Sequence, residues 1–204
     1  MNKLGSIGIA TGVLLISLIL ITATAASVIN NQTSGISEEN IEQMLDDVLN
    51  EITTYIQIKD KIGKYYTTNG ETQIEKIAIL IKPLISENID ISDLTIKLCN
   101  GEDIKILSYS GNSEFIGSQK LFNHQIWDKI TYDTFGFIVL SDRDDSLDSY
   151  SVLNKDMAYM IIKLSEDFAI SKGESIIVTF LPLSGTTITL ELKAPLPMSK
   201  IVTL

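Results

Sequence analysis

The largest group of side chains that could hold a ligand is a run of aspartates between residues 142 and 148. It consists of Asp142, Asp144, Asp145 and Asp148. Carboxylates at this spacing can offer several oxygens to a hard cation such as Ca²⁺. The run does not match an EF-hand loop, because it lacks the glycine and the terminal glutamate of that pattern. Two interpretations stay open: a solvated acidic loop, or a site for Ca²⁺ or another divalent cation.

The composition leaves few ways to build a catalytic centre. The chain has one histidine, His124, and one cysteine, Cys99. A lone histidine cannot form a metal site or a catalytic triad, and one cysteine cannot form an internal disulfide. The sequence also contains no glycine-rich phosphate loop and no nucleophile elbow. We therefore expect no enzymatic activity and no required cofactor, with His124 in a structural role and Cys99 as a small apolar core residue.

Length and charge narrow the class of protein further. The chain has 204 residues, which fits one medium domain plus an additional segment. Its hydrophobic content of 45% is too high for a chain that is disordered by composition. The net charge of −10 argues against nucleic acid as a partner, because there is no basic surface to neutralise phosphates. It also argues against attraction to anionic lipid headgroups.

An uncharged apolar segment covers residues 7–29. As a helix it is long enough to cross the ~30 Å hydrocarbon layer of a membrane. It could be a secretory signal peptide cut near residues 23–26, a permanent membrane anchor, or a class III (prepilin-like) signal cut before the apolar helix. Small residues recur in it at a spacing of four: Gly8 and Gly12, Ala23 and Ser27. This spacing lets apolar helices pack closely; together with Lys3 and Gly5 just before the segment, it favours the class III signal.

A second helix is expected after the polar residues 30–35. Ser37 fits an N-cap, and apolar residues then recur at three- and four-residue spacing from Ile41 to Ile56. This pattern predicts an amphipathic helix of about six turns, which we expect to end near Gly63.

The chain has one N-glycosylation sequon, which begins at Asn31. Such a triplet marks a surface position in a secreted protein, although it also arises by chance. Asn31 lies two residues after the apolar segment, where packing of that segment could hide it. It is therefore only a candidate for modification.

The chain after residue 67 has the pattern of a β-rich domain. Short runs of β-branched residues alternate with clusters of Asn, Gly, Ser and Asp. Strands are expected at residues 74–81, 93–99, 104–109, 135–140, 158–164, 175–181, 186–192 and 200–202. About eight strands at this spacing are typical of an immunoglobulin-like β-sandwich. The predicted class is α+β: a long N-terminal helix, first hydrophobic and then amphipathic, followed by a β-sandwich head.

The two ends of the apolar segment read Gly-Ile-Ala-Thr at residues 8–11 and Ala-Ala-Ser-Val-Ile at residues 25–29. They resemble the N-terminus of the archaeal flagellins (archaellins), which typically has Gly-Ile-Gly-Thr and Ala-Ala-Ser-Val-Leu. In that family a prepilin-type peptidase cuts after a glycine two residues before this block. The resemblance therefore implies cleavage between Gly5 and Ser6. It also implies that the following helix packs in a filament core through Gly8, Gly12, Leu18, Ala23 and Ser27.

Four motifs in the head are similar to archaellin motifs and occur in the same order. They are residues 89–96, 141–146, 152–156 and 180–187, which resemble a strand entry, an aspartate-rich loop, the turn after it and a C-terminal hairpin. Residues 111–134 match none of the motifs and are expected to be a variable surface loop.

The resemblance implies a structural subunit that polymerises into the archaellum filament for swimming. Its expected parts are a leader (residues 1–5), an N-terminal helix (6–63) and a β-sandwich outer domain (64–204). Its expected partners are copies of itself or other archaellins, the prepilin-type peptidase, the archaellum membrane machinery, and the membrane before assembly. The expected location is extracellular. Two alternatives remain: an adhesive archaeal pilin, and a membrane-anchored β-sandwich of the stator type that does not polymerise.

Overall fold

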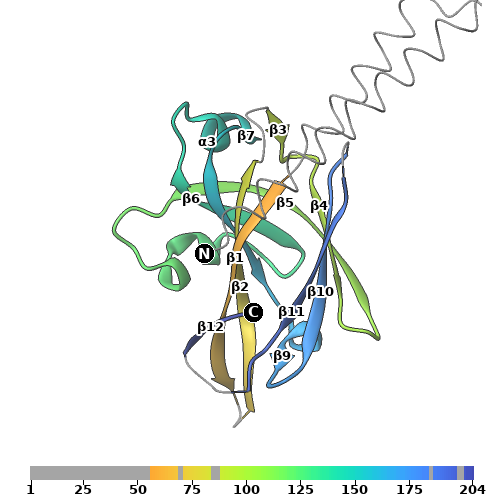
Figure 1. Cartoon of the computed structure of the whole chain (residues 1–204). Coiled ribbons are helices and arrows are strands. Elements are labelled where there is room, and N and C mark those ends of the chain that lie inside the picture. Colours follow the sequence, from red (N-terminus) through yellow and green to blue (C-terminus); the bar gives the residue numbers. More distant parts are fainter. Residues whose placement is uncertain (1–55, 69–70, 84–87, 184–185, 197–199) are drawn as a thin grey trace, which may run out of the picture. The chain divides into compact units, whose positions relative to one another are not determined.

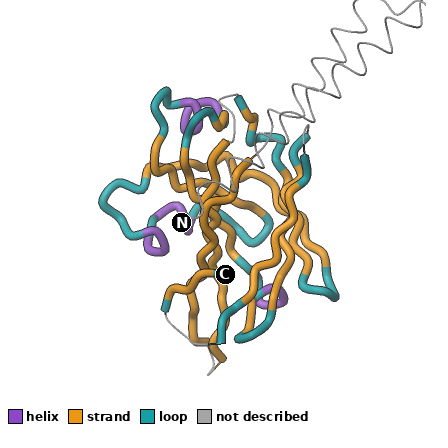
Figure 2. The backbone as a smooth tube through the Cα atoms, in the orientation of Figure 1, coloured by secondary structure: helices purple, strands orange, loops and turns teal. Residues whose placement is uncertain are grey.

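The computed structural model describes residues 56–68, 71–83, 88–183, 186–196 and 200–204. Within these ranges almost all regular structure is β-strand (Figures 1 and 2). The strands of the main sheet are β1 (Ile56–Thr68), β2 (Glu71–Pro83), β4 (Thr95–Cys99), β5 (Ile104–Phe115), β6 (Thr134–Ser141), β8 (Met157–Lys163), β9 (Ile170–Ser171), β10 (Ser175–Leu181), β11 (Ile188–Lys193) and β12 (Ile201–Thr203). Two further short strands, β3 (Ile89–Asp90) and β7 (Val152–Leu153), pair with each other.

The main sheet runs in the order β11-β10-β4-β5-β6-β8-β2-β1-β12, and β9 pairs with β2. Neighbouring strands are antiparallel except for β5 and β6, which are parallel. The sheet curls, so that the inner faces of β4 and β10 bury their side chains in the same core as those of β2, β6 and β8 (Figure 1). The expected sandwich-like head is confirmed in this form, as one continuous curled sheet.

The eight strands expected from the sequence are all present, although their ends shift by a few residues. The helix expected to end near Gly63 is wrong in its last part, because residues 56–63 belong to β1. Ile56 and Ile58 also alternate at the two-residue period of a strand, and pairing along the length of β2 selects that conformation. Gly63 is not a helix breaker. A Cβ there would lie 2.9 Å from Cγ2 of Ile74, so the site needs glycine for close packing.

The segment between β5 and β6, residues 116–133, is not the surface loop that the sequence suggested. It forms two short 3-10 helices, η1 (Leu121–Asn123) and η2 (Gln125–Asp128), and buries Phe122, Ile126, Trp127 and Ile130. These side chains pack on the outer face of the sheet against Ala78, Ile138 and Ile161, and they form a second hydrophobic cluster. We call residues 116–133 the covering segment.

Burial on both faces explains the composition of the central strands. In β6, Phe135, Phe137 and Val139 face the main core, while Ile138 faces the covering segment. In β8, Met160 faces inward and Ile161 faces outward in the same way. Strands covered on both sides read as continuous hydrophobic runs rather than as alternating ones.

The expectation for the single histidine is confirmed, and the expectation for the single cysteine is wrong. His124 is buried and structural, as expected: its Nδ1 accepts the backbone N–H of Ile126, and its Nε2 lies 3.0 Å from the backbone oxygen of Phe115. Cys99 is half-exposed rather than in the core. Within β4 it lies on the face of Thr95 and Lys97, opposite the buried Ile96 and Leu98, because strand side chains alternate.

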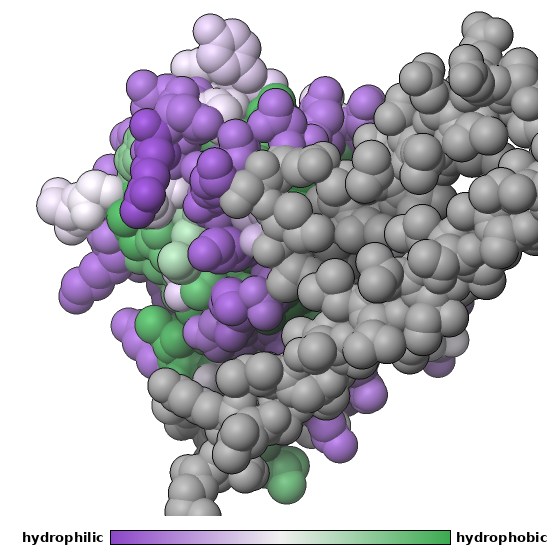
Figure 3. Space-filling model, turned by 45° about the horizontal axis from the view of Figure 1, so that its top comes forward, coloured by the Kyte–Doolittle hydropathy of each residue, from purple (hydrophilic) through white to green (hydrophobic). Residues whose placement is uncertain are grey.

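On the face shown in Figure 3, hydrophilic side chains cover most of the described surface, and smaller apolar areas lie between them. Among the described residues, no helix has the length and apolar character needed to span a membrane. The apolar segment at residues 7–29 and the amphipathic segment up to residue 55 lie outside the described residues.

Candidate metal-binding site

The acidic run lies in the connection between β6 and β8. The chain leaves β6 at Ser141, passes through the aspartates, forms the short helix α3 (Ser146–Tyr150), and returns through β7 to β8. The pairing of β7 with β3 anchors this excursion to the rest of the head. Among the described non-glycine residues, positive φ angles occur only here, at Asp145, Ser151 and Lys155. The connection is therefore sharply folded, which brings its two ends together.

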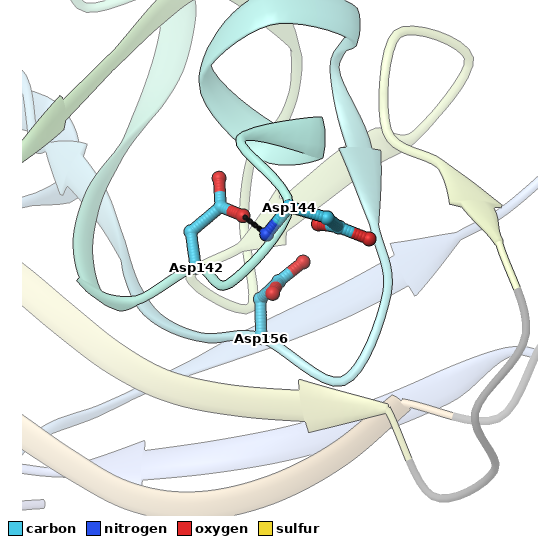
Figure 4. A group of neighbouring side chains, drawn as sticks. All are labelled: Asp142, Asp144 and Asp156. Atoms are coloured by element: carbon cyan, nitrogen blue, oxygen red, sulfur yellow. Dashed lines mark hydrogen bonds between the residues drawn. The ribbon is translucent and has the colours of Figure 1, made fainter.

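Three carboxylates from the two ends of this connection meet. Asp142, Asp144 and Asp156 each place one oxygen so that the three lie within 4.8 Å of one another. In Figure 4 the Asp156 side chain points toward the turn that carries Asp142 and Asp144. Asp142 shapes that turn: its Oδ1 accepts the N–H of Asp144 (3.3 Å) and of Ser146 (3.2 Å), and its Oδ2 accepts the N–H of Leu147 (3.1 Å).

Asp156 is the buried member of the trio, with only 1% of its surface exposed. Its Oδ2 accepts the backbone N–H of Asn154 at 2.7 Å and lies 3.3 Å from the Ser146 hydroxyl, which also donates to Val152 O at 2.9 Å. Its Oδ1 is buried and has no hydrogen-bond partner among the described residues, and the same holds for the side-chain oxygen of Asn154. Buried oxygens without a partner are costly, so this pair of atoms needs an explanation.

The electrostatics of the trio follow from burial and crowding. Burial raises the pKa of Asp156, and the neighbouring charges of Asp142 and Asp144 raise it further. The pKa of the exposed Asp144 is lowered instead, chiefly by hydrogen bonding to Ser146. Without a cation, the site therefore disfavours the ionised form of Asp156.

The donor set fits a hard divalent cation. Ca²⁺ binds six to eight oxygens from carboxylates, amide carbonyls and water. The trio supplies three carboxylates, and the two buried oxygens without hydrogen-bond partners are of the two protein types that Ca²⁺ accepts. A bound cation would supply the missing partner and would relieve the repulsion among the carboxylates.

The structure brings together only part of the acidic run expected from the sequence. Asp142 and Asp144 belong to the trio, whereas Asp145 is exposed and outside it. Asp148 lies in α3, and its side chain is outside what the structure describes. The sequence interpretation missed Asp156, although residues 152–156 had been recognised as a motif of the family. Asp156 is part of that motif, but only the folded connection shows that residues 141–146 and residues 152–156 contribute to the same site.

The other candidate residues cannot be placed. Gly5, Ser6, Gly8, Gly12, Leu18, Ala23, Ser27 and Asn31 all lie outside the described residues. The leader, the apolar helix and the sequon therefore remain predictions.

Comparison with known proteins gives a sequence match that covers both the N-terminal segment and the head. The sequence profile of archaeal-type flagellins matches residues 5–192. The chain belongs to the archaeal-type flagellin family. Flagellin B3 of Methanocaldococcus jannaschii is 30% identical over 213 residues, which cover 100% of this chain and 96% of that protein. Flagellin B4 of Pyrococcus abyssi is 30% identical over 156 residues, covering 72% of this chain and 70% of that protein. The family resemblance inferred from the sequence is thereby confirmed.

Solved flagellin structures share the fold. The crystal structure of archaeal flagellin FlaB1 from Methanocaldococcus jannaschii has a TM-score of 0.65 at 23% identity, covering 72% of this chain and 94% of that one. The archaeal flagellum of Methanospirillum hungatei gives a TM-score of 0.54 at 11% identity, covering 97% of this chain and 99% of that one. The first match supports the sandwich-like architecture of this flagellin's head.

Proposed function

We propose that this flagellin is a structural subunit that polymerises into the archaellum filament and serves swimming motility rather than catalysis. One observation carries the proposal: the family profile extends from residue 5 to residue 192, so it includes both the apolar segment and the head. A tethered domain that does not polymerise would need only a membrane anchor. The joint match favours a subunit in which both parts follow the flagellin pattern, and it supports the proposal that the mature protein works outside the cell.

The proposed mechanism assigns a separate task to each part. The leader, residues 1–5, is removed by a prepilin-type peptidase between Gly5 and Ser6, while the apolar helix holds the subunit in the membrane. On assembly by the archaellum membrane machinery, that helix leaves the membrane and packs with its copies to form the filament core. The immunoglobulin-like head forms the outer wall. Contacts between unlike surfaces of successive copies do not close, and they give an open helical array.

The acidic site has a supporting role in this scheme. Asp142, Asp144 and Asp156 would hold a divalent cation such as Ca²⁺. A bound cation would supply positive charge where these three carboxylates, from the two ends of the β6–β8 connection, converge. The chain's own residues shape the site, because Asp142 fixes the turn and Ser146 orients Asp156. The folded head is then most stable in a medium that contains the cation.

Electron microscopy of cells that make the protein, and of the purified protein, tests the main proposal. Wild type is expected to form filaments, and its deletion is expected to abolish swimming, which distinguishes an archaellum from an adhesive pilus. Leu18→Lys places a charge in a segment without a partner carboxylate between residues 7 and 29. A lysine at a helix centre costs about 2.5–3.5 kcal/mol on membrane insertion scales. An unpaired charge inside the assembled core is also strongly destabilising.

Leu183→Lys is the matched control, because it adds the same charge at a leucine that is 81% exposed in the head. We expect Leu18→Lys to abolish filaments and Leu183→Lys to leave them intact. Normal filaments from Leu18→Lys would show that the apolar helix is not the assembly core, and the protein would then be better explained as a tethered β-sandwich.

A further inference from the structure

A small basic pocket lies where β1 and β12 meet the covering segment. It has a volume of about 220 Å³, and its lining includes Lys64, Lys120 and Lys200. Phe122 and Ile201 add apolar surface to the same pocket. Three lysines line this one small pocket although the chain carries 26 acidic and only 16 basic residues.

The chain does not neutralise this charge itself. Among the described residues, none of the three pocket lysines forms an ion pair; Lys64 donates instead to the neutral Oδ1 of Asn123 at 3.1 Å. Lys64 is also the cross-strand partner of Lys76. Lys76 is in turn the cross-strand partner of Lys163, which makes a row of three lysines across β1, β2 and β8. Like charges opposite one another destabilise a sheet, so the row adds positive potential that an anion could offset.

We infer that this pocket receives a carboxylate side chain from a second copy of this chain in the filament. The inference deepens the proposed function and rests on it, because it names a contact between heads. The chain has a net charge of −10, so copies brought within the Debye length of ~8–10 Å of one another repel. A pocket that pairs with a carboxylate of the next copy turns part of this repulsion into attraction. Carboxylates are also the charged groups that a second copy offers most abundantly.

The lining of the pocket also indicates the kind of contact. It contains three lysines and no carboxylate, so two copies cannot join pocket to pocket. The carboxylate must come from a different surface of the neighbouring copy. A contact between unlike surfaces is heterologous, and when the rotation does not close it propagates into an open filament.

Zero-length cross-linking of assembled wild-type filaments tests the contact directly. A carbodiimide joins lysine to a carboxylate only where the two groups touch. Filaments grown from a mixture of ¹⁴N- and ¹⁵N-labelled chains distinguish links between copies from links within one copy. We expect mass spectrometry to find links between copies at Lys64, Lys120 or Lys200. Links only within one copy, or none at these three lysines, would overturn the inference. Wild-type filaments must be present for the experiment, so an absence of filaments counts against the proposed function instead.

Two double variants test how much the pocket lysines contribute to the free energy of filament assembly. Lys120→Gln with Lys200→Gln removes two exposed pocket charges, while Lys59→Gln with Lys172→Gln removes two exposed charges outside the pocket. Both change the net charge equally. We expect the pocket variant to raise the critical concentration for assembly several-fold more than the control, and to flatten its dependence on salt because the screened contact is gone. Equal behaviour of the two double variants would contradict the inference even if both still form filaments.

Discussion

The ammonium group of Lys76 lies 4.8 Å from the centre of the Trp127 ring. This contact joins β2 to the covering segment through a cation–π interaction. The Trp127 indole N–H also donates to the backbone oxygen of Leu121 at 2.8 Å, and its ring stacks with that of Phe122. Trp127 is thus held within the covering segment and packed against the sheet. We therefore expect its side chain to be needed for the covering segment to stay packed on the outer face of the sheet.

Replacing Trp127 with alanine should destabilise the head by about 3–5 kcal/mol, the usual cost of removing a buried aromatic side chain. Tyr132→Ala is the control, since Tyr132 lies in the same segment and is 54% exposed. Its effect should stay within about 0.5 kcal/mol. Urea unfolding of the purified protein measures both free energies. Similar values for the two variants would mean that the covering segment is a surface loop after all.

Asp156→Asn should have opposite effects with and without a divalent cation. In EDTA the variant removes a buried charge next to two other carboxylates, and its side-chain oxygen can keep the bonds from Asn154 and Ser146. We expect the unfolding free energy to rise by about 1 kcal/mol under those conditions. In Ca²⁺ the variant should lose the stabilisation that wild type gains.

Asp145→Asn provides the comparison, because Asp145 belongs to the same acidic run and lies outside the trio. It should melt like wild type in both media and keep the Ca²⁺-dependent shift. The cation-site proposal fails if the wild-type melting temperature is the same in EDTA and in Ca²⁺, and the acidic loop is then simply solvated.

The pH dependence of the same variant gives a second measure. The pKa of Asp156 is raised in the folded state by burial and by Asp142 and Asp144. Such a group contributes stability that is fully present below its unfolded pKa of ~3.9 and is lost as the pH rises through the folded pKa. In EDTA, the unfolding free energy of wild type minus that of Asp156→Asn should therefore fall as the pH rises above about 4.

With Ca²⁺ present the sign should reverse. A cation needs ionised carboxylates, so its stabilisation of wild type grows as the pH rises. Using the difference between wild type and variant cancels the contributions of groups distant from the trio, whereas Asp142 and Asp144 are coupled to Asp156 and report on the same site. The measurement is a set of urea titrations between pH 3 and 7, and the same slope in both media would contradict cation binding.

The sequence predicted the strands of the head well, because a strand that is buried on one face alternates at a two-residue period. Thr95-Ile96-Lys97-Leu98 in β4 and Ile188–Lys193 in β11 are examples. It failed at β1, where apolar residues up to Ile56 fit a helical spacing. Only the pairing with β2 selects a strand there, and that pairing cannot be derived from local sequence. The parallel pairing of β5 with β6 and the packing of residues 116–133 on the outer face depend on tertiary contacts in the same way.

The candidate site could likewise be predicted only where its residues are close in the sequence. The spacing of Asp142 and Asp144 was visible in the sequence, because both lie in one turn. Asp156 reaches them only after the chain has passed through α3 and β7. Its burial, which makes it the electrostatically unusual member of the trio, depends on the folded connection. Sequence spacing alone also grouped Asp145 with Asp142 and Asp144, whereas in the structure Asp145 lies outside the trio.

The last prediction concerns the leader. We expect the mature chain to begin at Ser6, because Lys3 and Gly5 stand directly before an uncharged segment and the family resemblance places the cut there. Gly5→Val should block removal of the leader, whereas Gly8→Val, three residues further on, should leave it intact. Gly8→Val should instead weaken assembly, since a side chain at that position separates closely packed helices. Mass spectrometry of the N-terminus, on membranes and on filaments, measures processing separately from assembly. An N-terminus near Ala26 would indicate an ordinary secretory signal, and an intact Met1 would indicate a permanent anchor; either would contradict a class III signal.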